Sequence, residues 1–170
     1  MRWFLYLLLY IPVQLFAYLI TPLLPLFKVW RHGALDNANR VGQGLRLPLW
    51  LSWFDTPDNA LYGDVNWLLF HPKTTHWDMV GWLYRNSLYG FKWTVLAMPI
   101  DVPGSHWEGN PAINHHTKEF GTLCIVQTNG AWQYKTVRPM FGKILVLNIG
   151  WLLDDCSQSK ALFMLSPRLK

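Results

Sequence analysis

The sequence predicts an α+β protein in which an N-terminal transmembrane or membrane-inserted helix precedes a small, mostly antiparallel β domain with one short helix. Residues 3–27 contain no charged side chain, residues 76–86 carry apolar side chains at helical spacing, and the last 50 residues hold four strand-like segments. We therefore expect a membrane anchor over residues 1–30, a basic linker over residues 31–46 and the α+β domain over residues 47–170.

The apolar run of residues 3–27 is long enough to cross a membrane, because about 20 residues at ~1.5 Å rise span a hydrocarbon core of roughly 30 Å. Pro12 removes a helical hydrogen bond near the middle and Pro22 would end the helix, so we expect a kinked helix over residues 2–21. Gln14, the one strongly polar side chain in the run, can satisfy backbone groups that Pro12 frees, bond a neighbouring helix, or simply be tolerated.

Three other placements of this run are alternatives to a spanning helix. A cleaved signal peptide is disfavoured, because the run is too long and no small residues mark a cleavage site. A helix lying in the membrane interface needs a polar face, which this segment lacks. A hairpin that enters one leaflet and turns at Pro12 stays open beside the spanning helix.

The flanks of the apolar run predict how it meets the bilayer. Aromatic side chains at both ends suit the two headgroup regions, and the basic residues that follow the run favour a cytoplasmic C-terminal portion by the positive-inside rule. Cys124 and Cys156 are the only cysteines in 170 residues and form no dense disulfide framework, which agrees with that side of the membrane. The predicted anchor residues are Trp3, Phe4, Tyr6, Pro12, Gln14, Phe27, Lys28, Trp30 and Arg31.

The charge distribution points to lipid as a partner. After Arg46 the chain has ten Lys or Arg and nine Asp or Glu residues, so the surplus of positive charge lies in the first 46 residues. A basic segment beside an apolar run suits anionic headgroups, whereas a nucleic-acid surface would need a basic face with aromatic side chains in the distal domain. We predict a bilayer and an unidentified protein as partners, and no nucleic acid.

The segment of residues 47–54 carries three aromatic side chains just after the basic linker. Trp50, Trp53 and Phe54 can form a second interfacial contact that lays the domain against the bilayer. An ordinary core segment has the same composition, and both interpretations stay open.

Three carboxylates in residues 55–64 raise the question of a cation site. Their spacing is not that of an EF-hand loop, and Pro57 with Gly63 favours turns, so we predict a turn. If the helix of residues 76–86 packs on this loop, a polar structural cluster forms from Asp55, Asp58, Asp64 and Arg85.

The distal half predicts a meander of antiparallel strands. The Asn129-Gly130 pair predicts a type I′ hairpin, and residues 139–142 supply a second turn. The side chains of residues 132–137 alternate roughly as one exposed face requires. The predicted strands are residues 91–100, 121–128, 131–138, 143–151 and 160–165.

The chain has no motif that predicts catalysis or metal binding. Zinc sites bring ligands at short fixed spacings, which are missing here, and adjacent histidines such as His115 and His116 point in different directions on any regular element. Cys124 lies in a predicted strand, where a thiol is usually inert, and neither a Gly-x-Ser-x-Gly elbow nor a phosphate-binding glycine loop occurs. We predict no enzyme activity, no catalytic, metal or cofactor-binding residues and no small-molecule substrate.

The chain contains three blocks: Trp-Phe-Asp-Thr-Pro-Asp-Asn at residues 53–59 with Gly-Asp at 63–64, Leu-Tyr-Arg-Asn-Ser-Leu-Tyr-Gly-Phe at 83–91, and Asn-Ile-Gly-Trp at 148–151. Together these blocks resemble an uncharacterised family of small membrane proteins of tailed bacteriophages. Tyr84 departs from the tryptophan of the family pattern.

The resemblance implies a location rather than an activity. It implies a phage protein that presents a small interaction domain at the host inner membrane, directed at a host protein or at the envelope. The alternative is a virion component that inserts into the membrane during genome delivery.

Overall fold

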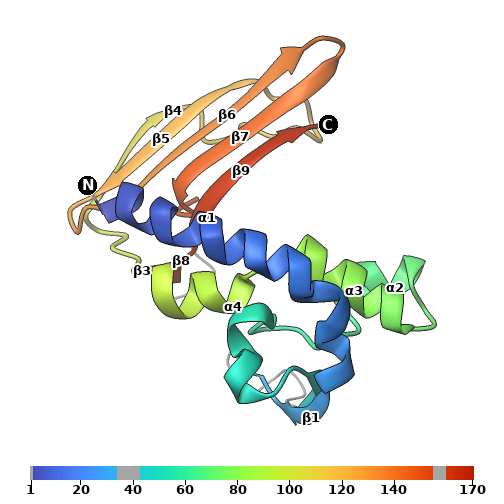
Figure 1. Cartoon of the computed structure of the whole chain (residues 1–170). Coiled ribbons are helices and arrows are strands. Elements are labelled where there is room, and N and C mark those ends of the chain that lie inside the picture. The colour runs from blue at the N-terminus through green and yellow to red at the C-terminus, as the bar shows by residue number, and fades with distance from the viewer. Residues whose placement is uncertain (1, 34–42, 155–159) are drawn as a thin grey trace. The chain divides into compact units, whose positions relative to one another are not determined.

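The structure is a computed structural model that describes residues 2–33, 43–154 and 160–170. Contacts divide the chain into two compact units, which we name unit 1 (Met1–Val95) and unit 2 (Leu96–Lys170). The boundaries predicted after residues 30 and 46 both fall inside unit 1. The α+β prediction is confirmed: a long apolar N-terminal helix comes first, and the later part of the chain forms a mostly antiparallel sheet (Figure 1).

Unit 1 begins with the predicted apolar helix. Helix α1 covers Arg2–Ile20 with Pro12 inside it, and the 3₁₀ helix η1 follows over Thr21–Phe27. Pro22 stands in the first turn of η1, where a missing N–H costs nothing, so the α-helix ends where the prolines predicted.

Two short strands and a 3₁₀ helix come next. Strands β1 (Val29–His32) and β2 (Gln43–Arg46) pair antiparallel, so both ends of the predicted linker are ordered, and residues 34–42 lie outside the described residues. Helix η2 covers Leu49–Phe54, within which Leu51 is buried while Trp50 and Trp53 are exposed.

The rest of unit 1 is helical. Helix α2 covers Val65–Phe70, α3 covers His76–Arg85, α4 covers Tyr89–Phe91 and the π-helical turn η3 covers Lys92–Leu96. The α3 prediction is confirmed, and a reciprocal pair of hydrogen bonds between Thr75 and Asp78 caps its start.

The predicted strand over residues 91–100 is wrong except for its last part, because α4 and η3 occupy most of it and strand β3 covers only Met98–Pro99. A short apolar run cannot be assigned to strand or buried helix from periodicity alone. Gly90 explains the outcome: its backbone N–H donates to the Asp55 carbonyl, and a Cβ there would lie 1.9 Å from the Ser52 carbonyl oxygen. The close backbone approach of α4 to η2 therefore requires glycine.

The core of unit 1 forms where η1, η2 and α3 meet. Its buried members come from all three elements and from the segments between them, and Ile20 and Phe54 pack against it as partly buried side chains. They are Leu24, Leu47, Leu51, Leu61, Met79 and Leu83.

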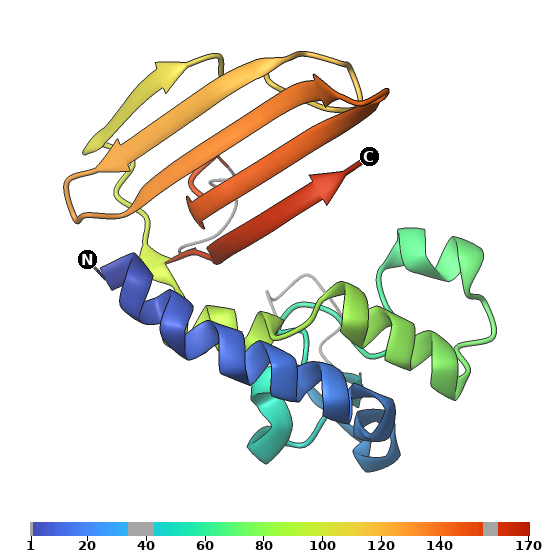
Figure 2. The same ribbon diagram turned by 45° about the horizontal axis from the view of Figure 1, so that its top comes forward.

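Unit 2 is built on a five-stranded antiparallel sheet in the order β4-β5-β6-β7-β9, and Figure 2 shows these strands side by side. A two-stranded pair of β3 and β8 (Lys160–Ala161) accompanies it. The predicted meander is confirmed, but Ser105–Gly109 was missed as a strand, and the last predicted strand divides into β8 and β9. The strands are β4 (Ser105–Gly109), β5 (Gly121–Gln127), β6 (Trp132–Met140), β7 (Lys143–Trp151) and β9 (Phe163–Leu169).

The type I′ turn predicted at Asn129-Gly130 is wrong, whereas the second turn, predicted without a type, has the positive φ angles of type I′. Between β5 and β6 only Gly130 has a positive φ, +85°, and Gly130 N–H donates to the Gln127 carbonyl, so this turn is not type I′. Between β6 and β7 both Phe141 (φ +50°) and Gly142 (φ +75°) adopt the left-handed conformation that type I′ needs. A phenylalanine thus occupies a position that normally favours Asn or Gly.

The sheet has two unlike faces. Gln133, Lys135 and Val137 share one face, and the register places Asn148 of β7 directly opposite Lys135. Tyr134 lies on the other face and is more exposed than Gln133, so at this point of β6 the polar side chain is the buried one.

Candidate functional site

Unit 1 exposes neighbouring apolar side chains of α1, η1 and η2, and we call them, together with Trp30, the apolar surface. Residues 2–27 are long and apolar enough to span a membrane, and only 22% of the 18-residue apolar stretch within them is buried. Phe27 of η1 contacts Trp50 of η2 edge to face, with ring centroids 5.7 Å apart, so the exposed side chains of these two elements adjoin. The most exposed members are Phe4, Leu5, Leu8, Leu15, Leu19, Leu23, Leu26, Trp30, Leu49 and Trp50.

The opposite stripe of α1 is docked against unit 1. Gln14 Nε2 donates to Ser87 Oγ (2.6 Å) and the Tyr10 hydroxyl donates to Gln14 Oε1 (2.5 Å), so Gln14 bonds another element rather than its own backbone. Tyr84 of α3 donates to the Tyr18 carbonyl oxygen (3.0 Å). Both views show α1, in dark blue, lying beside α3 (Figures 1 and 2).

Further contacts join α1 and η1 to the rest of unit 1. Nε2 of His76 lies 3.0 Å from the Pro22 carbonyl oxygen, and the rings of Phe16 and Phe54 lie 6.2 Å apart. Trp3, the first predicted anchor residue, is buried next to Phe4, whereas Phe4 is exposed. Of the other predicted anchor residues, Tyr6 is half-buried, and Pro12, Phe27, Lys28 and Trp30 are exposed.

Two arginines assigned to headgroups by the sequence are used inside unit 1. Arg31 Nη2 lies 2.6 Å from Asp55 Oδ2, and Arg31 also donates to the Leu47 and His32 carbonyl oxygens. Arg46 is buried and donates to the Thr56 carbonyl oxygen (2.8 Å). Their guanidinium groups therefore stabilise the loop that follows η2.

Residues 53–59 comprise the end of η2 and the loop that follows it. Asp55 is only 2% exposed, and burial raises its pKa to about 6, although the nearby guanidinium groups of Arg31 and Arg46 lower it. Thr56 Oγ1 donates to the Asn59 carbonyl oxygen (2.6 Å), which closes the turn that the sequence predicts. The contacts of residues 53–59 therefore stabilise the fold of unit 1.

The four members of the predicted polar cluster have separate partners. Asp55 pairs with Arg31, the Tyr89 hydroxyl lies 3.5 Å from Asp58, and Asp64 caps α2 by accepting from the Trp67 N–H (2.7 Å). Arg85 stacks over the rings of Trp67 and Trp82, 5.8 and 5.6 Å from their centroids. Within the described residues, no group of His, Cys, Asp and Glu is arranged to hold a metal ion.

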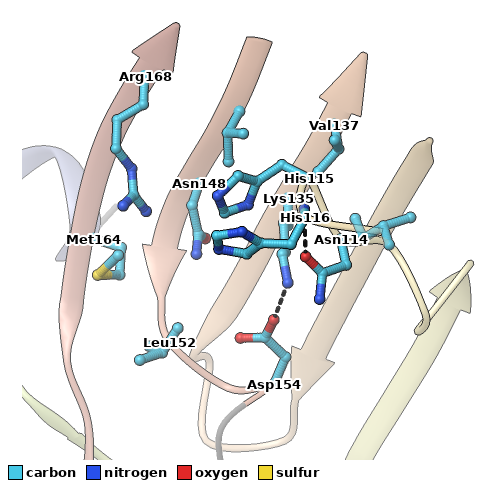
Figure 3. Close-up of a pocket in the computed structure, with 12 residues that line it drawn as sticks. Asn114, His115, His116, Lys135, Val137, Asn148, Leu152, Asp154, Met164 and Arg168 are labelled. Carbon is cyan, nitrogen blue, oxygen red and sulfur yellow. Dashed lines mark hydrogen bonds and ion pairs between the residues drawn. The ribbon is translucent and has the colours of Figure 1, made fainter. Parts of the chain in front are cut away.

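Unit 2 contains a cavity on one face of the sheet, lined by both polar and apolar side chains, which we call the sheet pocket (Figure 3). Its volume is about 400 Å³. The strands contribute Lys135 of β6, Asn148 of β7 and Arg168 of β9, and the turn before β5 contributes His115 and His116. Further lining residues are Ile113, Asn114, Val137, Val146, Leu152, Asp154 and Met164.

A buried amide organises the polar side of the sheet pocket. Gln133 is fully buried, its Nε2 donates to Asn148 Oδ1 (3.1 Å) and to Asp154 Oδ1 (2.8 Å), and its Oε1 accepts from the Leu153 and Asp154 N–H groups. Asp154 Oδ2 accepts from Lys135 Nζ (2.7 Å). Because both ends of Gln133 are bonded, Asn148 and Asp154 have fixed orientations.

The two histidines lie one over the other at the sheet pocket. Their ring centroids are 3.9 Å apart, and His115 Nε2 is buried without a hydrogen-bond partner among the described residues. Desolvation, followed by the positive side chains of His116, Lys170, Arg168 and Lys135, holds the pKa of His115 below its usual range. The expectation that adjacent histidines point apart was made for regular elements, and these two stand instead in a turn closed by the Asn114–Glu119 bridge.

Sequence reasoning missed the sheet pocket because its members are far apart in the chain. One signal was available: Asn148 interrupts an otherwise apolar strand, and Gln133 and Lys135 stand two residues apart in another. Polar residues on one face of neighbouring strands indicate a polar site. Cys124 lies on β5, half-buried, and Cys156 lies outside the described residues.

Comparison with known proteins identifies the family. No curated protein and no solved structure matches the chain. A family of unknown function, DUF7338, matches residues 1–167, which is almost the whole chain. The chain therefore belongs to the DUF7338 family, a family of unknown function.

Proposed function

We propose that the protein is a monotopic membrane protein whose unit 1 lies in one leaflet and holds unit 2 at the bilayer as a small interaction domain. The observation that carries the proposal is the apolar surface, which remains exposed although the other stripe of α1 is docked within unit 1. Large contiguous apolar surfaces are rare on monomeric soluble proteins, and they indicate a membrane or a protein partner.

Lipid is the partner that fits the apolar surface best. Residues 3–27 have no charged side chain, and exposed Phe27, Trp30 and Trp50 stand at the end of the run with Lys28. Aromatic rings and a flexible ammonium group are typical of the headgroup region. A protein interface would instead show polar side chains around its apolar centre.

The contacts of α1 favour a helix lying along the membrane over a helix crossing it. A crossing helix would carry α3 into the hydrocarbon, because Gln14 and Tyr18 are bonded to Ser87 and Tyr84. Helix α3 contains Asp78 and Arg85, and each charge at the bilayer centre costs about 2.5–3.5 kcal/mol or more. An interfacial helix needs a face turned away from lipid, and here unit 1 covers that face.

Nitroxide depth measurements test this placement. In a Cys124→Ser, Cys156→Ser background, spin labels at Phe4, Ile11 and Leu19 report immersion depth from their relaxation by oxygen and by a water-soluble nickel complex. We expect three similar, shallow depths. A maximum at Ile11 with shallow values at Phe4 and Leu19 would show a crossing helix and would reject the monotopic arrangement.

We further propose that the protein acts in a tailed bacteriophage, at the host inner membrane and with unit 2 in the cytoplasm. The three sequence blocks at residues 53–64, 83–91 and 148–151 support this source. Quantitative mass spectrometry of purified particles and of infected-cell membranes tests it. Enrichment in membranes supports a host-directed or envelope-modifying role, whereas a fixed number of copies per particle would replace it with a component of genome delivery.

A further inference from the structure

We propose that the sheet pocket of unit 2 binds a small organic oxyanion, a carboxylate or phosphate group joined to an apolar body. Nothing in the family assignment or in the membrane role of unit 1 requires such a site. The proposal rests on the charge, the hydrogen-bond donors and the size of the sheet pocket.

The charge of the sheet pocket favours an anion. Asp154 is the one carboxylate among the described residues that line it, and that carboxylate is already bonded to Lys135 and to Gln133. Arg168 adds a second full positive charge, and no ion pair of its guanidinium group occurs among the described residues. Guanidinium groups bind carboxylate and phosphate through two parallel hydrogen bonds.

An amide and an imidazole complement the guanidinium group. The Asn148 amide is oriented by Gln133, whose Nε2 donates to its Oδ1, so its own Nδ2 is left to donate elsewhere. Nε2 of His115 is buried at the sheet pocket without a partner among the described residues, which costs free energy unless a ligand bonds it. Figure 3 shows Arg168, Asn148 and the two histidine rings around the same space.

The size and the remaining lining indicate that the anion carries an apolar part. About 400 Å³ lies in the range of small-molecule sites and exceeds what a bare carboxylate or phosphate fills. Ile113, Val146 and Met164 supply apolar contact. A lipid headgroup and a soluble metabolite can both provide this chemistry.

Binding is tested on the full chain in nanodiscs of zwitterionic phosphatidylcholine. Inorganic phosphate, benzoate and phenyl phosphate are titrated while NMR follows the histidine ring signals, assigned by substitution. We expect saturable shifts of His115 with benzoate or phenyl phosphate, weaker shifts with inorganic phosphate, and a rise in the pKa of His115, because an anion stabilises the imidazolium form.

Matched arginine variants show whether the sheet pocket is responsible. Arg168→Gln should weaken binding about tenfold or more, since a charge-assisted hydrogen bond is lost, whereas Arg138→Gln on the other face of the same sheet should leave it unchanged. Arg168→Lys, which keeps the charge without the two parallel bonds, should give an intermediate value. Absence of saturable shifts with all three probes, or equal loss in both glutamine variants, overturns the proposal.

A second set of nanodiscs separates the two sources of the anion. Including phosphatidylglycerol should abolish benzoate binding if the natural ligand is an anionic headgroup, since lipid then occupies the sheet pocket. Unchanged benzoate binding assigns the sheet pocket to a soluble organic anion. This comparison is made once saturable benzoate binding has been observed in phosphatidylcholine nanodiscs.

Discussion

At the scale of single residues, polar side chains in unexpected places carry most of the information about this protein. Gln14 stands within an apolar helix, Asp55 is buried beside Arg31, and Gln133 is fully buried in a strand. In each case the hydrogen-bond partners come from a distant part of the chain, so the sequence shows the polar residue but does not show which groups it bonds.

Replacing Gln14 with Leu distinguishes a docked helix from an independent one. In the docked helix the change removes the bond to buried Ser87 and leaves its hydroxyl without that partner, so the free energy of unfolding should fall by about 1–3 kcal/mol. Urea unfolding in mild detergent measures it. Leu15→Gln is the control on the exposed face, and equal stability of Gln14→Leu and wild type would mean that α1 does not depend on this contact.

Asp55 predicts a pH dependence whose sign follows from its raised pKa. Between pH 4 and pH 6 the unfolded chain has released this proton while the native protein still holds it. Stability that is fully present below pH 4 should therefore be lost as pH rises through 6, by at most about 3 kcal/mol, relative to Asp55→Asn. The measurement is the difference in unfolding free energy between wild type and variant from pH 4 to 7. A difference that grows in favour of wild type as pH rises would show that Arg31 and Arg46 outweigh burial.

At the scale of elements, the β6–β7 hairpin turn combines local strain with an exposed aromatic ring. Phe141 has a φ of +50° and is 90% exposed, so it gives up backbone free energy without gaining burial in unit 2. Phe141→Asn should stabilise the protein by up to about 1 kcal/mol, since Asn-Gly favours type I′ turns. Thermal unfolding measures the change, and Phe141→Leu, which keeps a strained apolar residue, should be neutral. A loss of stability with Asn would show that the ring packs in solution.

The elements predicted correctly are those whose signal is local. The apolar run and its prolines predicted the extent of α1, and the spacing around Met79 and Leu83 predicted α3. Alternation of side chains, together with turn residues, predicted β5, β6 and β7. The errors concern non-local effects. Residues 91–100 became helical through backbone contact at Gly90, and β4 is a strand because β5 pairs with it.

The candidate sites divide in the same way. The apolar surface follows from a continuous run of residues and could be predicted, although the stripe that is docked within unit 1 could not. The sheet pocket assembles Lys135, Asn148 and Arg168 through strand register, together with a turn that brings His115 over them. No single segment of the sequence carries that combination.

At the scale of the whole molecule, positive charge occurs in both units. Unit 1 has eight Lys or Arg and five Asp or Glu residues, and unit 2 has seven and five, so both are net positive. Anionic membranes attract such proteins by about 1 kcal/mol for each basic residue near the surface.

Vesicle flotation should separate this attraction from the apolar contribution. We expect tighter binding to phosphatidylglycerol than to phosphatidylcholine vesicles, with the difference reduced at 0.5 M salt but with binding retained, because apolar burial is not screened. Lys28→Gln should reduce the difference between the two lipids, whereas Lys143→Gln in unit 2 is the control. Full release at high salt would show that the apolar surface does not enter the bilayer.

The saturated amide of Gln133 also bears on the chemical ageing of the protein. Its two N–H bonds and its two acceptor positions are all in use, so no other side chain of that size reproduces the pattern. Deamidation to glutamate would convert the donor end into a second carboxylate facing Asp154. Burial protects the amide from water while unit 2 is folded, so the damage would accumulate during transient unfolding, and a protein altered in this way would refold with lower stability because two donated hydrogen bonds are lost.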